Sequence, residues 1–479
     1  MIPPAPPGVA GSLRLAGLLA ALACVNGGAP SPGPEPADLV LEDVVVFDPR
    51  SRTALPHRSV VVESGRVAAV LAPGAPLPEA RTVIAGRGRL LTPGLVDAHS
   101  HISYVLGDSI AAGGGFIARL SMDPDSIAAY RARFAEAYLP YGVTTVRDVG
   151  SDERHLPMLA AWMQRSPDAP DFWPVGGALV SHEEGRVPFP GHAVVTDPED
   201  ARRKVRAYHE AGLRHVKLYW RLREPEFVAA LEAARQLGMH VTGHVDFQVL
   251  GFNRALDLGL HSFEHAYTVA VSALTEEEFL AAWREELPRV VGDEQRGRFY
   301  LGVMAYMHVL GPENTEVERL IERLDETDST VVPTLHLFAQ RLGLSPHVTP
   351  PFASFDDLTW LDESQRAWAI EGYGILAGYV RKMWEAGIPL AVGTDWAEPG
   401  PAVLSEIALL HDAGIPMPDS LAIATLGGAA AIGVDDEVGA IEPGYRANLV
   451  LWDDDPLADP SALFGGITVI KDGAVWSRG

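Results

Sequence analysis

The chain has 479 residues, 47% of them hydrophobic, which is enough for a large core and for more than one ordinary domain. Its 63 acidic residues outnumber its 38 lysines and arginines and give a formal net charge of −25 at pH 7. So acidic a composition argues against nucleic acid as a partner and against electrostatic binding to anionic membranes.

The N-terminal stretch has the pattern of an export signal. A short apolar run, Leu15–Ala23, precedes Cys24, the only cysteine of the chain, and a stretch rich in Pro, Gly and Ser follows. The run is too short for a transmembrane helix but suits a signal-peptide core. The residues up to Cys24 resemble the end of a bacterial lipoprotein signal, although the position three before the cysteine is alanine rather than leucine. We expect residues 1–37 to be leader and linker, and the mature protein to be exported, periplasmic or lipid-anchored at Cys24. The alternative is a disordered tail on a cytoplasmic protein.

Strand-like segments follow this stretch. Residues 39–46 and 59–70 alternate or run apolar, with turn signals between them. The segment 91–102 then places His99 and His101 two residues apart. On a β-strand such residues point to the same face, and two neutral imidazoles on one face make half of a metal site. Alone this pattern is weak, because surface or hydrogen-bonded histidines produce it as well.

Later segments repeat the arrangement of polar residues at strand ends. Residues 215–220 alternate strictly, with Lys217 on the polar face. His244, His265 and Asp395 each lie at or near the end of a later apolar segment. In a (β/α)8 barrel, chemistry collects at the C-terminal ends of the strands, which is where these residues would lie.

Helices are predicted between these strands. Residues 226–237 are rich in good helix formers and are followed by Gly238, a suitable C-cap, and residues 247–258 are the next candidate. Residues 274–330 have a helical and charged pattern, and residues 335–384 form a second long insertion. Strands that alternate with helices favour a parallel sheet.

Taken together, these motifs resemble the amidohydrolase superfamily, and within it the branch that binds two metal ions. That branch carries His-x-His on strand 1, a lysine on strand 4, histidines on strands 5 and 6 and an aspartate on strand 8. The matching residues here are His99, His101, Lys217, His244, His265 and Asp395. Residues 142–148 also resemble the family's strand 2, and residues 424–452 resemble its return to a small β-domain.

The resemblance implies an α/β fold, a (β/α)8 TIM-like barrel with a small β-sandwich domain built from both chain ends. Residues 38–92 and 438–479 would form the β-sandwich, and residues 93–437 the metal-dependent hydrolase barrel. The two long insertions would overhang the active site, where such segments usually set specificity.

The resemblance also implies two divalent metal ions, with zinc favoured by the nitrogen and carboxylate ligands. Three residues would hold one ion and two the other, namely His99, His101 and Asp395, then His244 and His265. Lys217 would bridge the ions after carbamylation by carbon dioxide, which needs the neutral amine that burial favours. A bridging hydroxide would attack the carbon of a C–N bond, and Asp395 would pass the proton to the leaving nitrogen.

The substrate implied is a small molecule whose identity the sequence leaves open. His182, near the end of the strand 3 region, is the candidate for polarising the substrate carbonyl, because related dipeptidase- and imidazolonepropionase-like enzymes carry a histidine hereabouts. A solvated loop histidine is the alternative. The oligomeric state also stays open, with a homo-oligomer as one option. So do the roles of four residues near the predicted site, Tyr219, Arg221, Arg223 and Trp396.

Three functions are compatible with these motifs. The favoured one is a prolidase- or dipeptidase-like hydrolase that uses two metals to cleave an amide, peptide or cyclic amide bond. The second is a mononuclear amidohydrolase, such as a deaminase or imidazolonepropionase. Lys217 argues against it, because that branch does not need a strand 4 lysine. The third is a non-enzymatic binding lipoprotein on a retired barrel, against which the complete ligand set argues.

Overall fold

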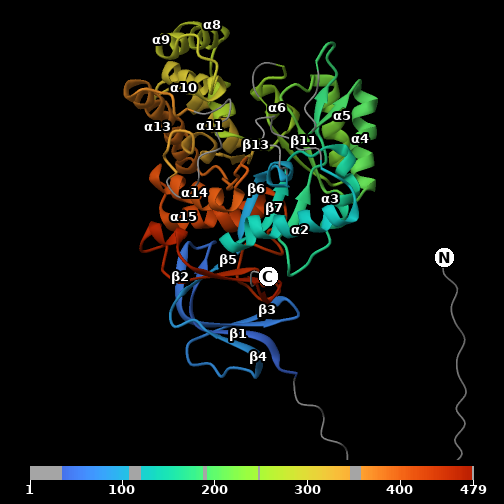
Figure 1. Cartoon of the computed structure of the whole chain (residues 1–479), viewed down its shortest axis with the longest axis vertical. Coiled ribbons are helices and arrows are strands. Elements are labelled where there is room, and N and C mark those ends of the chain that lie inside the picture. Colours follow the sequence, from blue (N-terminus) through green and yellow to red (C-terminus); the bar gives the residue numbers. More distant parts are fainter. Residues whose placement is uncertain (1–34, 107–119, 187–190, 246–248, 346–357, 477–479) are drawn as a thin grey trace, which may run out of the picture. The chain divides into compact units, whose positions relative to one another are not determined.

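The computed structural model of the chain describes residues 35–106, 120–186, 191–245, 249–345 and 358–476 (Figure 1). The predicted leader with Cys24 lies outside these residues. Within the described ranges, no helix is long and apolar enough to cross a membrane.

A ring of parallel strands forms the larger part of the fold, and the strands follow one another around it in sequence order. They are β6 (Leu95–Ser100), β7 (Val143–Asp148), β8 (Asp171–Pro174), β9 (Ala178–Ser181), β11 (His215–Leu218), β12 (His240–Gly243), β13 (Ser262–Glu264) and β14 (Thr330–Val332). β8 pairs with β7 and β9 pairs with β11, so these two short segments together occupy the third position of the ring. A further strand, β10 (His192–Val195), pairs with β9.

The last position of the ring belongs to the segment before Asp395, where the resemblance predicts strand 8. This segment does not form a continuous strand. It forms one regular bridge, from Leu390 to Val331. Beyond it the amides of Thr394 and Asp395 both donate to the carbonyl oxygen of His99, each over 2.9 Å. Asp395 has a φ of 49°, in the left-handed region. The turn there ends regular pairing early and brings Asp395 beside the end of β6.

Helices connect the strands, as the alternating pattern predicts. Those of the barrel include α1 (Ile102–Leu106), α2 (Pro124–Tyr138), α3 (Leu156–Trp162), α4 (Pro198–Glu210), α5 (Glu224–Gln236), α6 (Phe252–Leu258), α7 (Ala266–Val271), α14 (Pro399–Asp412), α15 (Met417–Ala422) and α16 (Gly428–Ala431). The helix predicted over residues 226–237 is α5, and it ends before Gly238, which has a φ of 66°. That residue is the glycine that a left-handed C-terminal position requires.

The insertion over residues 274–330 is helical, as its sequence predicts. It holds α8 (Glu276–Ala281), a π-helical turn (Ala282–Glu286), α9 (Leu287–Val291), α10 (Arg298–Leu310) and α11 (Thr315–Glu326). The second insertion holds α12 (His336–Ala339) and α13 (Glu363–Glu385). These helices gather at the end of the barrel opposite β1 to β4 (Figure 1).

Strands from both chain ends build the smaller β-domain. They are β1 (Ala37–Asp48), β2 (Thr53–Glu63), β3 (Arg66–Leu71), β4 (Ala80–Ala85), β5 (Leu90–Pro93), β15 (Leu449–Trp452), β16 (Ile467–Lys471) and β17 (Ala474–Val475). Antiparallel pairing of β5 with β15 joins the two halves around a shared apolar core that includes Leu41, Leu91 and Leu449. The predicted architecture, a barrel with a small β-domain from both chain ends, is confirmed, and the strands of that domain form one hydrogen-bonded sheet.

A buried ionic cluster ties the barrel to the β-domain. Asp171, the first residue of β8, lies 3.1 Å from the Nζ of Lys471 and accepts a hydrogen bond of 3.0 Å from the side-chain Nδ2 of Asn448. Lys471 is fully buried, and Asp472 also pairs with its ammonium over 2.6 Å. Each polar group in this cluster depends on the others, because a buried charge without a partner is costly.

We predict that Asp171→Ala lowers the free energy of unfolding by about 2–4 kcal/mol, because it leaves a buried lysine and a buried amide short of an acceptor. Asp38→Ala is the matched control. It removes an exposed pair with Arg81, over 2.8 Å, and an exposed hydrogen bond of 2.7 Å from the backbone amide of Ser64, which together should contribute about 1 kcal/mol or less. Urea unfolding of the two variants measures the difference. Equal effects would show that the buried cluster adds nothing special.

Candidate metal centre

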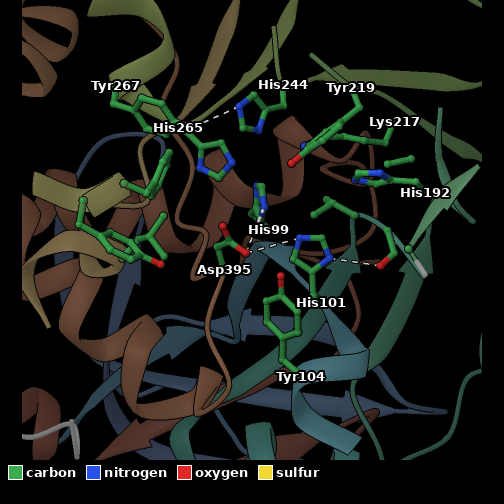
Figure 2. A pocket seen from close by; sticks show the side chains of 17 residues that line it. His99, His101, Tyr104, His192, Lys217, Tyr219, His244, His265, Tyr267 and Asp395 are labelled. Atoms are coloured by element: carbon green, nitrogen blue, oxygen red, sulfur yellow. Dashed lines mark hydrogen bonds and ion pairs between the residues drawn. The ribbon is translucent and has the colours of Figure 1, made fainter. Parts of the chain in front are cut away.

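Three of the predicted ligands converge at the end of β6. Nε2 of His101 lies 3.4 Å from Oδ1 of Asp395, and Nε2 of His99 lies 3.9 Å from the same oxygen (Figure 2). One potential ligand atom from each of the three lies within 4.8 Å of the others. Two nitrogens and one oxygen at this spacing suit a divalent ion such as zinc.

The second pair of histidines continues this cluster. The ring centroid of His265 lies 4.6 Å from that of His99 and 4.7 Å from that of His244. His265 has a φ of 67° and is held there by two hydrogen bonds, from its amide to Val332 and between its Nδ1 and the hydroxyl of Thr334, each 2.8 Å long. A left-handed histidine that its surroundings hold so firmly is typical of a functional site.

Burial favours the neutral imidazole at His101, His244 and His265. It lowers the pKa of His101 to about 4 and holds the pKa of both His244 and His265 well below the ordinary value. Neutral imidazole is the form that ligates a metal, so these three histidines need not lose a proton at neutral pH before they bind one.

Lys217 lies among these residues from β11, and its side chain is 2% exposed. Burial lowers the pKa of Lys217 to about 8, although the negative charge of Glu264, whose Oε1 lies 3.8 Å from Nζ, acts in the opposite direction. The amine therefore loses its proton far more readily than an exposed lysine, whose pKa is about 10.4.

Glu264 is a site residue that the sequence motifs do not indicate. It is fully buried at the end of β13, and its carboxylate contacts Nδ1 of His99 over 2.5 Å and Nη2 of Arg147 over 2.8 Å. The hydroxyl of Thr242 also donates to it. Burial alone would raise the pKa of Glu264, but the nearby Lys217, His99 and Arg147 hold it well below its ordinary value. The carboxylate is the acceptor that orients the His99 ring, with its other nitrogen toward Asp395.

The six predicted ligands line a cavity of about 370 Å³, a size that suits a small molecule. His192 and Tyr219 line its far side, with ring centroids 4.8 Å apart. His192 begins β10, beyond the segment where a strand 3 histidine is predicted. In the sequence, the one feature that points to His192 is its place after Gly191 at the start of a short apolar run, which is typical of the start of a strand.

The predicted candidate His182 lies elsewhere. This residue is exposed and lines a smaller adjoining cavity of about 140 Å³, on the other side of His192, which lines both cavities. The backbone amide of His182 donates to the carbonyl oxygen of Val195 over 2.7 Å. Pairing with β10 carries this part of the chain away from the main cavity. The geometry therefore favours His192 over His182 as the histidine that faces a substrate.

The remaining candidates divide between the cavity and its surroundings. Arg221 pairs with Glu183 and stacks over the ring of Trp220 at 4.7 Å, and Arg223 pairs with Glu226 over 2.6 Å. Both arginines thus have acidic partners outside the main cavity. The other two candidates are Tyr219, which lines the cavity, and Trp396, which is buried next to it.

A sequence profile described as the amidohydrolase family matches residues 90–475. Among solved structures, a putative prolidase from Bifidobacterium longum superposes with a TM-score of 0.63 at 22% identity, covering 93% of this chain and 96% of that one. An ochratoxinase from A. niger gives a TM-score of 0.65 at 18% identity, with coverages of 93% and 97%. At such identities the likeness concerns the fold.

Matches to curated proteins are local. An imidazolonepropionase from Geobacillus kaustophilus is 36% identical over 109 residues, which is 21% of this chain and 25% of that protein. An adenine deaminase from Chelativorans sp. is 42% identical over 65 residues, which is 14% of this chain and 11% of that protein. The chain thus matches a quarter or less of these relatives.

We predict that Glu264→Gln weakens divalent-metal affinity by about 10–100-fold, because the His99 ring loses its charged acceptor. Competition with a chelator that reports on bound metal measures the affinity. The matched control is Glu406→Gln, at another fully buried glutamate, which accepts the amides of Leu335 and His336 over 2.9 and 2.6 Å. Comparable loss of metal from both variants would mean that general destabilisation, and not orientation of His99, is responsible.

Proposed function

The chain belongs to the amidohydrolase family, and on this basis we propose that it hydrolyses a carbon–nitrogen bond of an amide, a dipeptide or a cyclic amide. One observation carries the proposal: five imidazoles, a carboxylate and a buried amine converge on one cavity. Solved relatives of the same fold that are described as a prolidase and a Xaa-Pro dipeptidase are consistent with it.

The donor set fits two divalent ions, with zinc favoured. His99, His101 and Asp395 would hold one, and His244 and His265 the other. When bound, such ions would polarise a substrate carbonyl and make water a nucleophile near neutral pH. A separation of 4.6 Å between the rings of His99 and His265 supports sites that adjoin.

Lys217 would connect the two sites as a carbamate. The ammonium would first lose one proton. The neutral amine would then attack carbon dioxide, so that an N–C bond forms, one C–O π bond breaks and a second proton is released, and a cationic side chain becomes an anionic carbamate. Only the deprotonated amine reacts, and with the pKa of Lys217 lowered to about 8 its fraction grows as the pH rises through that value. An ordinary lysine would need a pH above about 10.

Asp395 would carry the proton of the reaction. Its carboxylate is partly exposed to the cavity and faces both His99 and His101, so it can accept a proton from the nucleophile and deliver it to the leaving nitrogen. His192 and Tyr219 would orient the substrate carbonyl from the other side. Burial lowers the pKa of His192 to about 4, so this side chain acts as a neutral N–H donor.

The alternative is a mononuclear deaminase or imidazolonepropionase that uses His99, His101, His244 and Asp395. The local matches to an imidazolonepropionase and an adenine deaminase favour it. The burial of Lys217 beside the histidines counts against it, because a site for one ion has no use for an amine at this position.

Metal counting tests the proposal. We predict two divalent ions per chain in active protein, and loss of metal and activity in Lys217→Ala, with partial recovery when a short carboxylic acid supplies the missing oxygens. Lys204→Ala is the control, since this lysine pairs with Glu153 at the surface over 2.7 Å. Fully active protein with a single ion would favour the mononuclear alternative.

We predict that Asp395→Asn retains most of its metal while kcat falls by about 10²–10⁴-fold, because the amide keeps one ligating oxygen but cannot accept the proton. Measuring kcat, metal content and melting temperature on this variant separates the roles. A structural aspartate would instead lower the melting temperature and leave kcat nearly normal.

A further inference from the structure

One wall of the cavity is largely aromatic and is built by α7, α10 and α12. Phe299 and Tyr300, in the first turn of α10, line it together with Tyr267 and Leu337. The rings meet edge to face, with Phe299 5.1 Å from Tyr300 and 5.8 Å from Tyr267 between centroids. Such contacts give the wall a defined shape rather than a loose apolar patch.

This wall begins at the proposed metal ligands. The hydroxyl of Tyr267 lies 3.2 Å from Nε2 of His244, and its ring stacks on His265 at 5.5 Å. Tyr267 and His192 lie on opposite sides of His99 and His265 (Figure 2). A substrate whose carbonyl faces His192 would therefore extend its next group along the aromatic wall.

The wall is also held rigid from behind. The guanidinium of Arg341 lies 3.7 Å from the ring centroid of Tyr300 and 4.7 Å from that of Trp396. One of its nitrogens donates to the carbonyl oxygen of Leu337 over 2.9 Å. A cation close to both rings restricts their orientation. Ligand binding therefore loses little side-chain entropy at this wall.

Phe299 itself is 48% exposed although it lines the cavity. The other large apolar side chains exposed in the described part of the chain lie outside this cavity, among them Leu77 and Val83. Covering exposed aromatic surface with an apolar part of a ligand removes it from water, which makes binding more favourable. Of the described residues that line the cavity, only Lys217 and Asp395 are lysine, arginine, aspartate or glutamate. Both belong to the proposed metal-binding residues.

We propose that this wall is the specificity site and that the substrate carries an aromatic or bulky apolar group next to the bond that is cleaved, with Phe299 as its main contact. The inference rests on the proposed function. It deepens that function by naming the substrate class, an uncharged aromatic or bulky apolar amide rather than one with a charged or small side group.

Binding of two hydroxamic acids to zinc-loaded protein tests the inference without turnover. Acetohydroxamic acid and 3-phenylpropanohydroxamic acid share a metal-binding head and differ in the phenyl tail. By calorimetry, the phenyl compound should bind about 10–100-fold more tightly to the unmodified protein. Phe299→Ala should reduce that ratio about three- to tenfold and leave the Kd of acetohydroxamic acid unchanged.

Leu77→Ala, at an exposed apolar residue of the β-domain, is the matched control and should leave both Kd values unchanged. Equal affinity for the two compounds, or an unchanged ratio in Phe299→Ala, would overturn the specificity site while the metal hydrolase stands. Failure of acetohydroxamic acid to bind zinc-loaded protein would overturn the proposed function, and the specificity site with it.

Discussion

The centre of the barrel depends on the ionic interactions of the Glu264 carboxylate. This carboxylate is fully buried and faces two basic side chains, Arg147 and Lys217, as well as the ring of His99. Each of these groups would be costly to bury alone, and together they compensate one another's charge. Arg147 extends the network, because its guanidinium also donates to the carbonyl oxygens of Ala98 and Ala431. The charges of the site are therefore part of the packing of the barrel.

Left-handed residues at strand ends give the site its geometry. His265 follows β13 and Asp395 follows the last strand position, with β14 between the two, and both have a positive φ although neither is a glycine. Each is held by backbone hydrogen bonds to an adjacent strand, to Val332 and to His99 respectively. The strain of such conformations is tolerated where the surroundings fix them, and it turns both side chains toward the cavity.

Much of this arrangement was accessible from the sequence. His99, His101, Lys217 and His244 lie on segments with the alternation of β-strands, in which every second residue points to the same face. Because a barrel brings the C-terminal ends of its strands together, these side chains are predicted to meet. The residues that tune the site were harder to find. Glu264 precedes a predicted ligand but carries no motif of its own, and His192 depends on how β10 returns after β9, which strand periodicity does not determine. His182 likewise lies outside the main cavity because, just after β9, its backbone pairs with the end of β10.

The pairing of β5 with β15 has a consequence for how the chain is made. These strands lie at opposite ends of the sequence, and β5 already pairs with β1 on its other side. During synthesis the whole barrel must therefore leave the ribosome before β5 acquires its second neighbour. Until then an apolar strand presents an open edge to other growing chains, and contacts of such large sequence separation form slowly. β15 and β16, which are translated after the barrel, thus complete a domain whose first strand emerged before it, which makes products truncated within the barrel especially prone to aggregate.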